Sequence, residues 1–137
     1  MILRLAGLAL LLAAGPAACD SSAPTKPETF DAGQEFTLAP GASAVARDGG
    51  LELTLVGVTE DSRCPTDVTC VWAGEVKVKI ALSAGSSNAG EREVREEEST
   101  TFADRQVAVV RVRPRPVSTG RIAPEDYRVT FRVSGAP

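Results

Sequence analysis

The sequence contains no histidine among its 137 residues. That absence removes the commonest general base, the commonest side-chain ligand of transition metals and every nucleophile that a histidine would activate. An excess of basic residues is also missing, since the net charge at pH 7 is −3 and nucleic-acid binding normally needs a strongly positive surface. We therefore expect a protein that is not an enzyme, has no cofactor and binds no nucleic acid.

Paired carboxylates are a catalytic arrangement that needs no histidine. Glycoside hydrolysis needs a pair of them, but nothing in the sequence distinguishes any two of the 18 aspartates and glutamates. A hydrolase with two unmarked carboxylates stays open as an alternative to a non-catalytic protein.

Long hydrophobic runs are scarce too. The apolar run at residues 5–14 is shorter than the roughly 20 residues that span a bilayer. Arg4 precedes this run, and the small residues Ala17 and Ala18 follow it, directly before Cys19. A positive start, a short apolar run and small residues are typical of an export signal, so residues 1–18 are expected to form a signal peptide.

The end of this segment, Pro16-Ala17-Ala18-Cys19, resembles the lipobox of bacterial lipoproteins, with Pro16 in place of the usual aliphatic residue. The resemblance implies cleavage before Cys19 and acylation of that cysteine. The protein would then be anchored by lipid to a bacterial membrane, facing the periplasm or the cell surface. An ordinary cleaved signal and an uncleaved anchor remain alternatives.

The segment after Cys19 is poor in apolar residues and rich in serine, threonine and proline. Such a composition buries little surface and favours an extended chain. We expect residues 19–34 to hold the lipidated cysteine and a flexible tether, with Phe30 as the first residue able to contact the domain. The folded domain is then expected at residues 35–137.

Cysteine is sparse, with an odd count of three. If Cys19 carries lipid, Cys64 and Cys70 are left as a pair in an oxidising compartment, where a disulfide persists. A metal site would need two further ligands, and the spacing is not that of a redox Cys-x-x-Cys motif. We expect a structural disulfide, worth about 2 kcal/mol or less because the loop is short.

Every second residue from Cys70 onward is apolar or small, while the other parity carries Glu75, Lys77 and Lys79. This period of two predicts a strand with one buried face. Cys70 and Trp72 share the buried parity, so the disulfide should be shielded from reductants and the indole should pack in the core. A surface position for Trp72, stacking on a ligand, is the alternative. The expected core comprises Trp72, Val76, Val78, Ile80, Tyr127 and Phe131.

The stretch Asp-Ser-Arg-Cys-Pro at 61–65 and Cys-Val-Trp-Ala-Gly at 70–74 resembles a segment shared by a group of small uncharacterised bacterial secreted proteins and lipoproteins. The resemblance is specific over residues 61–82 and loose over residues 35–133. It implies a fold type and a location, and no particular reaction.

Short alternating segments separated by turn residues recur along the whole domain. The apolar parity flips near Gly57, which predicts a bulge, and residues 107–112 are apolar on both parities, as in an interior strand. Residues 83–90 are expected to form a loop, and residues 91–98 an exposed edge strand or hairpin arm. The pattern predicts an all-β fold, a single antiparallel β-sandwich of the immunoglobulin-like kind with about seven or eight strands. A small barrel is the alternative.

The disulfide loop is also the candidate binding site, through Arg63, Pro65 and Asp67. Its acidic residues Glu60, Asp61 and Asp67 could bind calcium, although Asp61 is better explained as a turn cap or a partner of Arg63. We expect a non-catalytic binding or structural module whose partner is an envelope protein or polymer. A protease-inhibitor-like or periplasmic accessory factor that uses the Cys64–Cys70 loop is the alternative.

The cationic run Arg111, Arg113 and Arg115 is expected to be a solvated strand face. Contact with anionic lipid or a cell-wall polymer is the other interpretation of this run.

Overall fold

The computed structural model describes residues 26–135. The expected signal peptide at residues 1–18 and the expected lipidation site Cys19 lie outside the described residues. Within the described range, no helix is long and apolar enough to cross a membrane. The elements are β1 (Glu28–Phe30), β2 (Glu35–Leu38), β3 (Ser43–Ala46), β4 (Glu52–Asp61), β5 (Val76–Ala84), β6 (Ser87–Arg95), β7 (Ser99–Phe102), β8 (Arg105–Arg113), the single-turn 3-10 helix η1 (Pro124–Asp126) and β9 (Arg128–Gly135).

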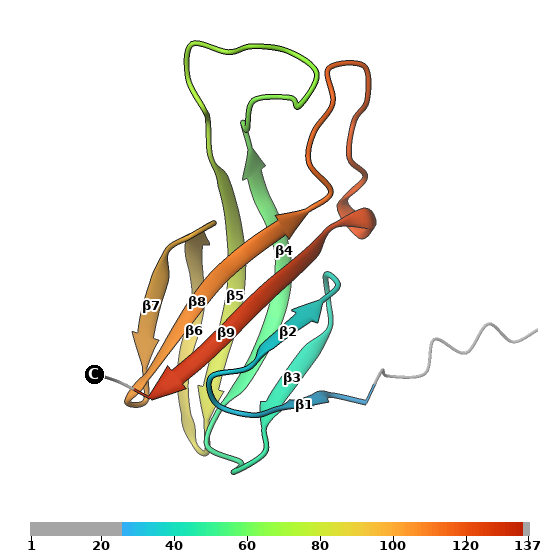
Figure 1. Ribbon diagram of the computed structural model, residues 1–137. Coiled ribbons are helices and arrows are strands. Elements are labelled where there is room, and N and C mark those ends of the chain that lie inside the picture. Colours follow the sequence, from blue (N-terminus) through green and yellow to red (C-terminus); the bar gives the residue numbers. More distant parts are fainter. Residues whose placement is uncertain (1–25, 136–137) are drawn as a thin grey trace, which may run out of the picture.

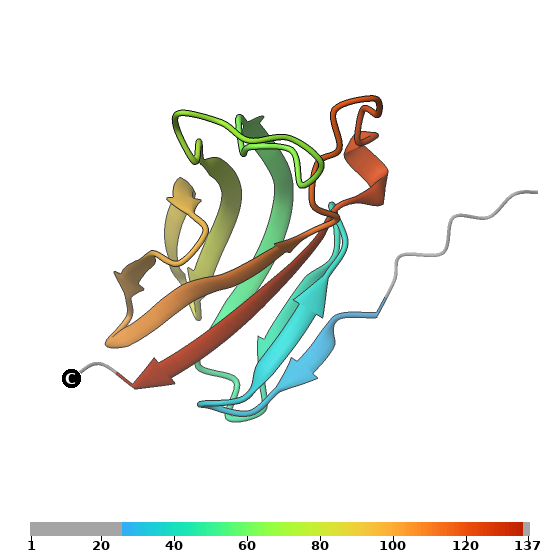
Figure 2. The ribbon, with the colours of Figure 1, turned by 45° about the horizontal axis from the view of Figure 1, so that its top comes forward.

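The strands form two packed sheets, which confirms the expected all-β sandwich (Figure 1). One sheet has the order β1-β3-β4-β5-β6 and the other has the order β2-β9-β8-β7. Neighbouring strands are antiparallel except for β1 and β3, which run parallel. Figure 2 turns the top of Figure 1 toward the viewer and shows the two sheets as separate layers.

The connectivity differs from that of an immunoglobulin domain. There, successive strands repeatedly cross between the two sheets. Here β3 to β6 follow one another within one sheet, and β7 to β9 follow one another within the other. This is the neighbour order of an up-and-down barrel, flattened into two layers, so the sandwich has meander topology rather than a Greek key.

The core follows the predicted period of two in the central strands. Val76, Val78 and Ile80 are at most 1% exposed, and Phe131 is fully buried. Tyr127, one residue before β9, is also buried. These members of the expected core are confirmed. They are buried because β5 and β9 are each an interior strand of their own sheet, and the opposite sheet covers their apolar faces.

Two bulges explain where the alternation breaks. In β4, the pairing with β5 shifts between Leu55 and Gly57, so that Val56 is left without a partner and is 40% exposed. This confirms the bulge predicted at Gly57. In β8, the pairing with β9 shifts between Val109 and Arg111. Because the inward parity changes there, this strand is apolar on both parities in the sequence.

The domain begins earlier than expected. Strand β1 lies inside the segment interpreted as tether, and Phe30 is only 3% exposed. Its ring stacks on Phe36 with the centroids 4.4 Å apart. The boundary at residue 35 is therefore wrong, because one aromatic side chain and three paired backbone residues hold this segment to the fold.

The expected loop at residues 83–90 is mostly a hairpin. Strand β5 runs to Ala84, which pairs with Ser87, the first residue of β6. Gly85 in the turn has a φ of 58°, a conformation that glycine adopts at low cost. Strand β6 is the edge of its sheet, as expected for the charged stretch.

Candidate functional site

Two long loops project from the same end of the sandwich (Figure 1). Loop 62–75 connects β4 to β5, and loop 114–127 connects β8 to β9. We call these two loops together the loop end. They belong to different sheets, so contacts between them join the two layers beyond the last strand residues.

The base of loop 62–75 continues the hairpin of β4 and β5. The backbone N–H of Ser62 donates to the carbonyl of Glu75 at 2.8 Å, and that of Cys64 donates to the carbonyl of Ala73 at 2.9 Å. Gly74 makes this approach possible, since a Cβ atom there would lie 1.8 Å from the carbonyl oxygen of Ser62. Its φ of 69° also favours glycine.

Arg63 fixes the two loops to each other. Its guanidinium donates to both carboxylate oxygens of Asp61, at 2.8 and 2.6 Å. It also donates to the carbonyls of Val112, at 2.8 Å, and of Pro114, at 3.0 Å. The expected pair with Asp61 is confirmed. The prediction that Arg63 is a binding residue is wrong. Its side chain is buried, with the residue only 7% exposed, and its charge is paired with Asp61 inside the protein.

Tyr127 completes this buried polar group by donating its hydroxyl to Asp61 at 2.9 Å. Burial acts to raise the pKa of Asp61, but the hydrogen bonds from Arg63 and Tyr127, with the charge of Arg63, outweigh it and hold this pKa below its usual value. Burial and the bond to Asp61 raise the pKa of Tyr127 to about 12. The group is therefore a stable ion pair with a neutral phenol at physiological pH.

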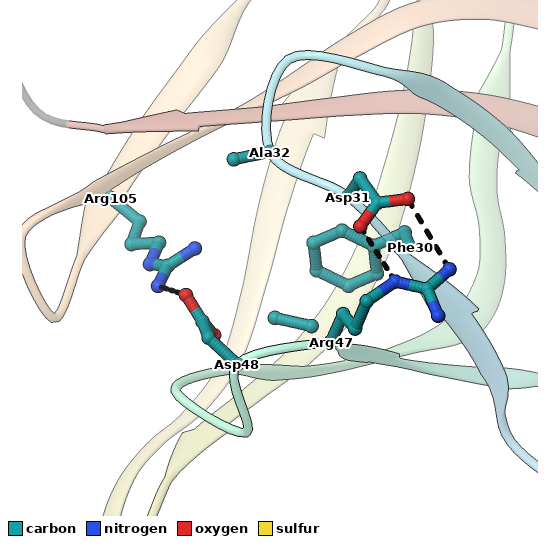
Figure 3. Close-up of a pocket in the computed structure, with 7 residues that line it drawn as sticks. Phe30, Asp31, Ala32, Arg47, Asp48 and Arg105 are labelled. Carbon is teal, nitrogen blue, oxygen red and sulfur yellow. Dashed lines mark hydrogen bonds and ion pairs between the residues drawn. The ribbon is translucent and has the colours of Figure 1, made fainter.

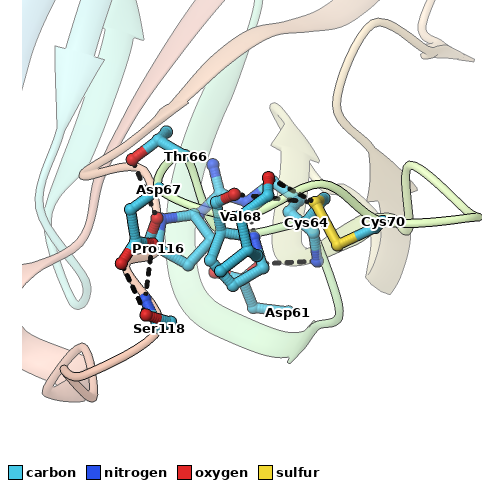
Figure 4. The surroundings of a disulfide bond; sticks show 10 residues. Asp61, Cys64, Thr66, Asp67, Val68, Cys70, Pro116 and Ser118 are labelled. Carbon is cyan, nitrogen blue, oxygen red and sulfur yellow. Dashed lines mark hydrogen bonds and ion pairs between the residues drawn. A yellow bond between two sulfur atoms is a disulfide. The ribbon is translucent and has the colours of Figure 1, made fainter.

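Cys64 and Cys70 form the expected disulfide, with their Cα atoms 5.9 Å apart (Figure 4). Cys70 itself is exposed, which corrects the expectation that the bond is shielded. The reason is that the bridge closes the tip of the hairpin and does not lie on the buried face of β5.

The enclosed residues are tied to loop 114–127. The backbone N–H of Thr66 donates to the carbonyl of Pro116 at 3.0 Å, and that of Ser118 donates to the carboxylate of Asp67 at 2.8 Å. Hydrogen bonds from Ser118 hold the pKa of Asp67 below its usual value. The carbonyl of Pro65 accepts from the backbone N–H of Val68 at 3.4 Å. Asp67 and Pro65 therefore serve the internal structure of the loop end, although the sequence suggested them as binding residues.

Trp72 is 82% exposed, so its assignment to the core was wrong. Trp72 has the same sequence parity as Gly74 and Val76, but strand β5 begins only at Val76. The facing strands β8 and β9 stop at Arg113 and start at Arg128, so the hairpin extends past the layer that would have covered the indole. The turn formers Pro65 and Gly74 were the only sequence signals that the strand does not reach Cys70.

The exposed apolar side chains of the domain gather at the loop end. Five large hydrophobic residues are exposed within residues 26–135, and all but Val56 lie on these two loops. They are Val68, Val71, Trp72 and Val117, with Val71 the most exposed at 92%. Singly exposed apolar residues are common, whereas a cluster of them marks an interaction surface.

The acidic residues considered for calcium do not converge. The carboxylate of Glu60 pairs with Lys77 at 2.8 Å, that of Asp61 with Arg63, and that of Asp67 with Ser118. Within the described part of the chain, no group of three or more acidic or cysteine residues is arranged to hold a metal ion.

A hollow of about 310 Å³ lies at the opposite end of the sandwich (Figure 3). Two ion pairs line it: Arg47 with Asp31 at 2.7 Å, and Arg105 with Asp48. Hydrogen bonds from these arginines lower the pKa of both aspartates. The hollow therefore offers neither a protonated acid nor an unpaired charge for chemistry.

Arg111, Arg113 and Arg115 are exposed, as expected for a solvated face, and form no ion pair with any residue in the range 26–135.

Comparison with known proteins adds no assignment, because no family model, no curated protein and no solved structure matches the chain. The loop end is therefore the feature from which a function has to be argued.

Proposed function

We propose that this protein is an exported, lipid-anchored binding module of the bacterial cell envelope, and that the loop end is its binding surface. The observation that carries the proposal is the exposure of Trp72 and Val71, at 82% and 92%, on a loop that is held at several points. The role is non-catalytic, because the carboxylates of Asp61 and Asp67 at the loop end are held by hydrogen bonds from Arg63, Tyr127 and Ser118.

The rigidity of the loop supports binding. The disulfide, the Arg63 contacts and the bonds to loop 114–127 limit the conformations of the apolar tip before any partner arrives. A preorganised loop loses less entropy on binding than a mobile one. Tryptophan is also the residue type that most often supplies a large share of the binding energy at an interface.

Export and anchoring are supported by independent features of the chain. A disulfide is stable in an oxidising compartment outside the cytoplasm. The short apolar run and the lipobox-like ending at Cys19 supply a route to that compartment and an anchor. Bacterial lipoproteins carry two or more acyl chains, which are enough for a stable anchor.

An inhibitor-like or accessory role is the second candidate. The stiff, projecting loop favours it, since protease inhibitors and similar factors use preorganised loops. Arg63 is not the residue offered to a partner, however, because its side chain is buried. A role of this kind has to use Val71 and Trp72.

The binding surface is tested by photo-crosslinking in intact cells. A photoreactive residue is placed at Val71, and in a matched variant at Ala32, which is exposed at the opposite end. We expect a crosslinked product of the full chain from position 71 and much less from position 32. Equal products from both positions, or none from position 71, would contradict the loop end as the binding surface.

The anchor is tested separately by cell fractionation of the parent and a Cys19→Ala variant. We expect the parent to be in the membrane fraction with the mass of attached acyl chains, and the variant to be released. A membrane-bound variant together with a parent that lacks added mass rules out lipid anchoring at Cys19.

A further inference from the structure

We propose that the loop end inserts into the surface of the lipid bilayer that holds the anchor, with Trp72 at the level of the headgroups. This inference rests on the proposed function and names the partner of the same site.

The tip suits a bilayer because it projects and is uncharged. Residues 68–74, Val-Thr-Cys-Val-Trp-Ala-Gly, contain no ionisable side chain, because Cys70 is held in the disulfide. The charged residues on either side of the tip have partners within the protein. Asp67 accepts a hydrogen bond from Ser118, and Glu75 forms ion pairs with Lys77 and Arg95. Insertion of the tip therefore buries no unpaired charge, which would be costly.

Trp72 has the chemistry of a membrane interface residue. The indole ring is large and apolar, while its N–H can still reach water or a headgroup oxygen, and tryptophans concentrate at this depth in membrane proteins. Val71 is beside it in the sequence and even more exposed, and Val68 and Val117 add apolar surface to the same end. A projecting tip of this kind enters a soft bilayer without needing a matching pocket.

Basic residues flank the loop end at the end of β8 and on loop 114–127. Arg113, Arg115 and Arg121 are exposed and have no ion-pair partner in the part of the chain that the structure describes. The acidic residues Glu125 and Asp126 of the same loop lie in η1, next to the start of β9 and away from the tip (Figure 1). Arginines in this position are attracted to anionic headgroups.

The direction of β1 allows an anchor at Cys19 to lie on the same side. Strand β1 runs parallel to β3 and therefore opposite to β4, which leads into the loop end. The chain thus reaches Glu28 from the side of the loop end. Glu28 pairs with Ala44, which in turn pairs with Leu53 of β4, so Glu28 and Leu53 lie at the same level of the sheet. From Leu53 to Asp61, at the end of β4, the strand advances eight residues, or about 26 Å.

The segment from Cys19 to Glu28 can span at most about 30 Å. The anchor can therefore lie in the plane of Asp61, and the tip extends beyond that plane into the headgroup layer. Since the anchor keeps the domain within this distance, the second contact is made at a high effective concentration of lipid.

Trp72 is the only tryptophan in the chain, so its fluorescence reports the tip directly. The full-length protein with its own lipid is reconstituted into vesicles of anionic phospholipid with and without brominated acyl chains. We expect a blue-shifted emission and strong quenching by the brominated lipid. The variant Val71→Asp, at a position that is 92% exposed and so tolerates the change, should lose at least half of the quenching.

The matched control moves the only tryptophan to the opposite end, in the double variant Trp72→Phe and Ala32→Trp. We expect emission typical of a solvated indole and no quenching from this variant. Water-like, unquenched emission from Trp72 overturns the inference, and so does equal quenching of both proteins.

The experiment separates this inference from the proposed function. If the purified chain carries no lipid but Trp72 is still quenched when vesicles are added, insertion stands and anchoring at Cys19 falls. If position 71 crosslinks to a protein in cells while Trp72 is not quenched in vesicles, the binding surface stands and the bilayer is the wrong partner. Absence of quenching, crosslinks and lipid rejects both proposals.

Discussion

Arg63 and Asp61 face each other across a single intervening residue, and their side chains are 4% and 10% exposed. Both oxygens of the carboxylate accept from the guanidinium, which continues to the carbonyls of Val112 and Pro114. A buried ion pair thus joins the end of β4 to the end of β8. The loop end is therefore held by this ion pair in addition to the disulfide.

Arg63→Ala should therefore be strongly destabilising. The change leaves the buried carboxylate of Asp61 without its cationic partner and two carbonyls without their side-chain donor, and breaking a buried pair typically costs about 3–5 kcal/mol. The measurement is urea unfolding followed by circular dichroism. Arg47→Ala is the control, because that arginine pairs with Asp31 at the exposed opposite end. Similar midpoints for the two variants would show that the buried pair does not hold the fold.

Tyr127, the only tyrosine in the chain, allows a direct titration. Its pKa is raised to about 12 in the folded protein, whereas an unfolded tyrosine titrates near pH 10. The folded state holds the phenol proton more tightly, so this contribution to stability is complete below about pH 10 and is lost as the pH rises toward 12. The near-ultraviolet absorbance of the phenolate should show the raised midpoint, and Tyr127→Phe should remove this part of the alkaline loss of stability. A midpoint near 10 in the native protein would mean that the phenol is neither buried nor bonded to Asp61.

Trp72→Ala should leave stability unchanged within about 0.5 kcal/mol, as is usual for surface substitutions. Ile80→Ala should cost about 2–5 kcal/mol, because Ile80 is fully buried in a central strand. Circular dichroism is again the suitable probe, since the exposed indole reports poorly on the core. A large loss from Trp72→Ala would restore the core assignment that the structure rejects.

Replacement of both Cys64 and Cys70 by serine should lower the unfolding free energy by about 2 kcal/mol or less and leave a folded β-protein. Because Cys70 is exposed, a mild reductant should also open the bond in the native protein, and alkylation should then label two cysteines in residues 26–135. Protection of both thiols until the protein unfolds would contradict this exposure. An unfolded double variant would show that the bridge contributes more than loop entropy.

The sequence was sufficient to predict the sandwich, the bulge at Gly57 and five of the six core residues that it named. These features depend on alternation within single strands, as in β5 and β9, where each residue faces either the other sheet or solvent. The strand order was not predictable in the same way, because an immunoglobulin-like sandwich and a meander use the same alternation. The alternation indicates which face of the sheet a side chain lies on, but it does not indicate which strands are neighbours in the sheet.

Prediction failed most clearly at the loop end. Trp72 has the parity of a core residue, but whether it is covered depends on where β8 and β9 end, about 40 or more residues further along the chain. Arg63 looked available for binding because its acceptors include two backbone carbonyls at Val112 and Pro114. Backbone carbonyls leave no mark in a sequence, so a buried arginine that uses them cannot be foreseen.

The parallel pairing of β1 with β3 has a mechanical consequence. Tension applied to the chain before Glu28 acts along the axis of β1, so its bonds to β3 are loaded in shear and have to fail together. A pull across the strand would instead break these bonds one at a time. Phe30, buried and stacked on Phe36, resists the same sliding motion. A pull on the chain before Glu28 is thus resisted at β1 itself, by its hydrogen bonds to β3 and by the buried ring of Phe30.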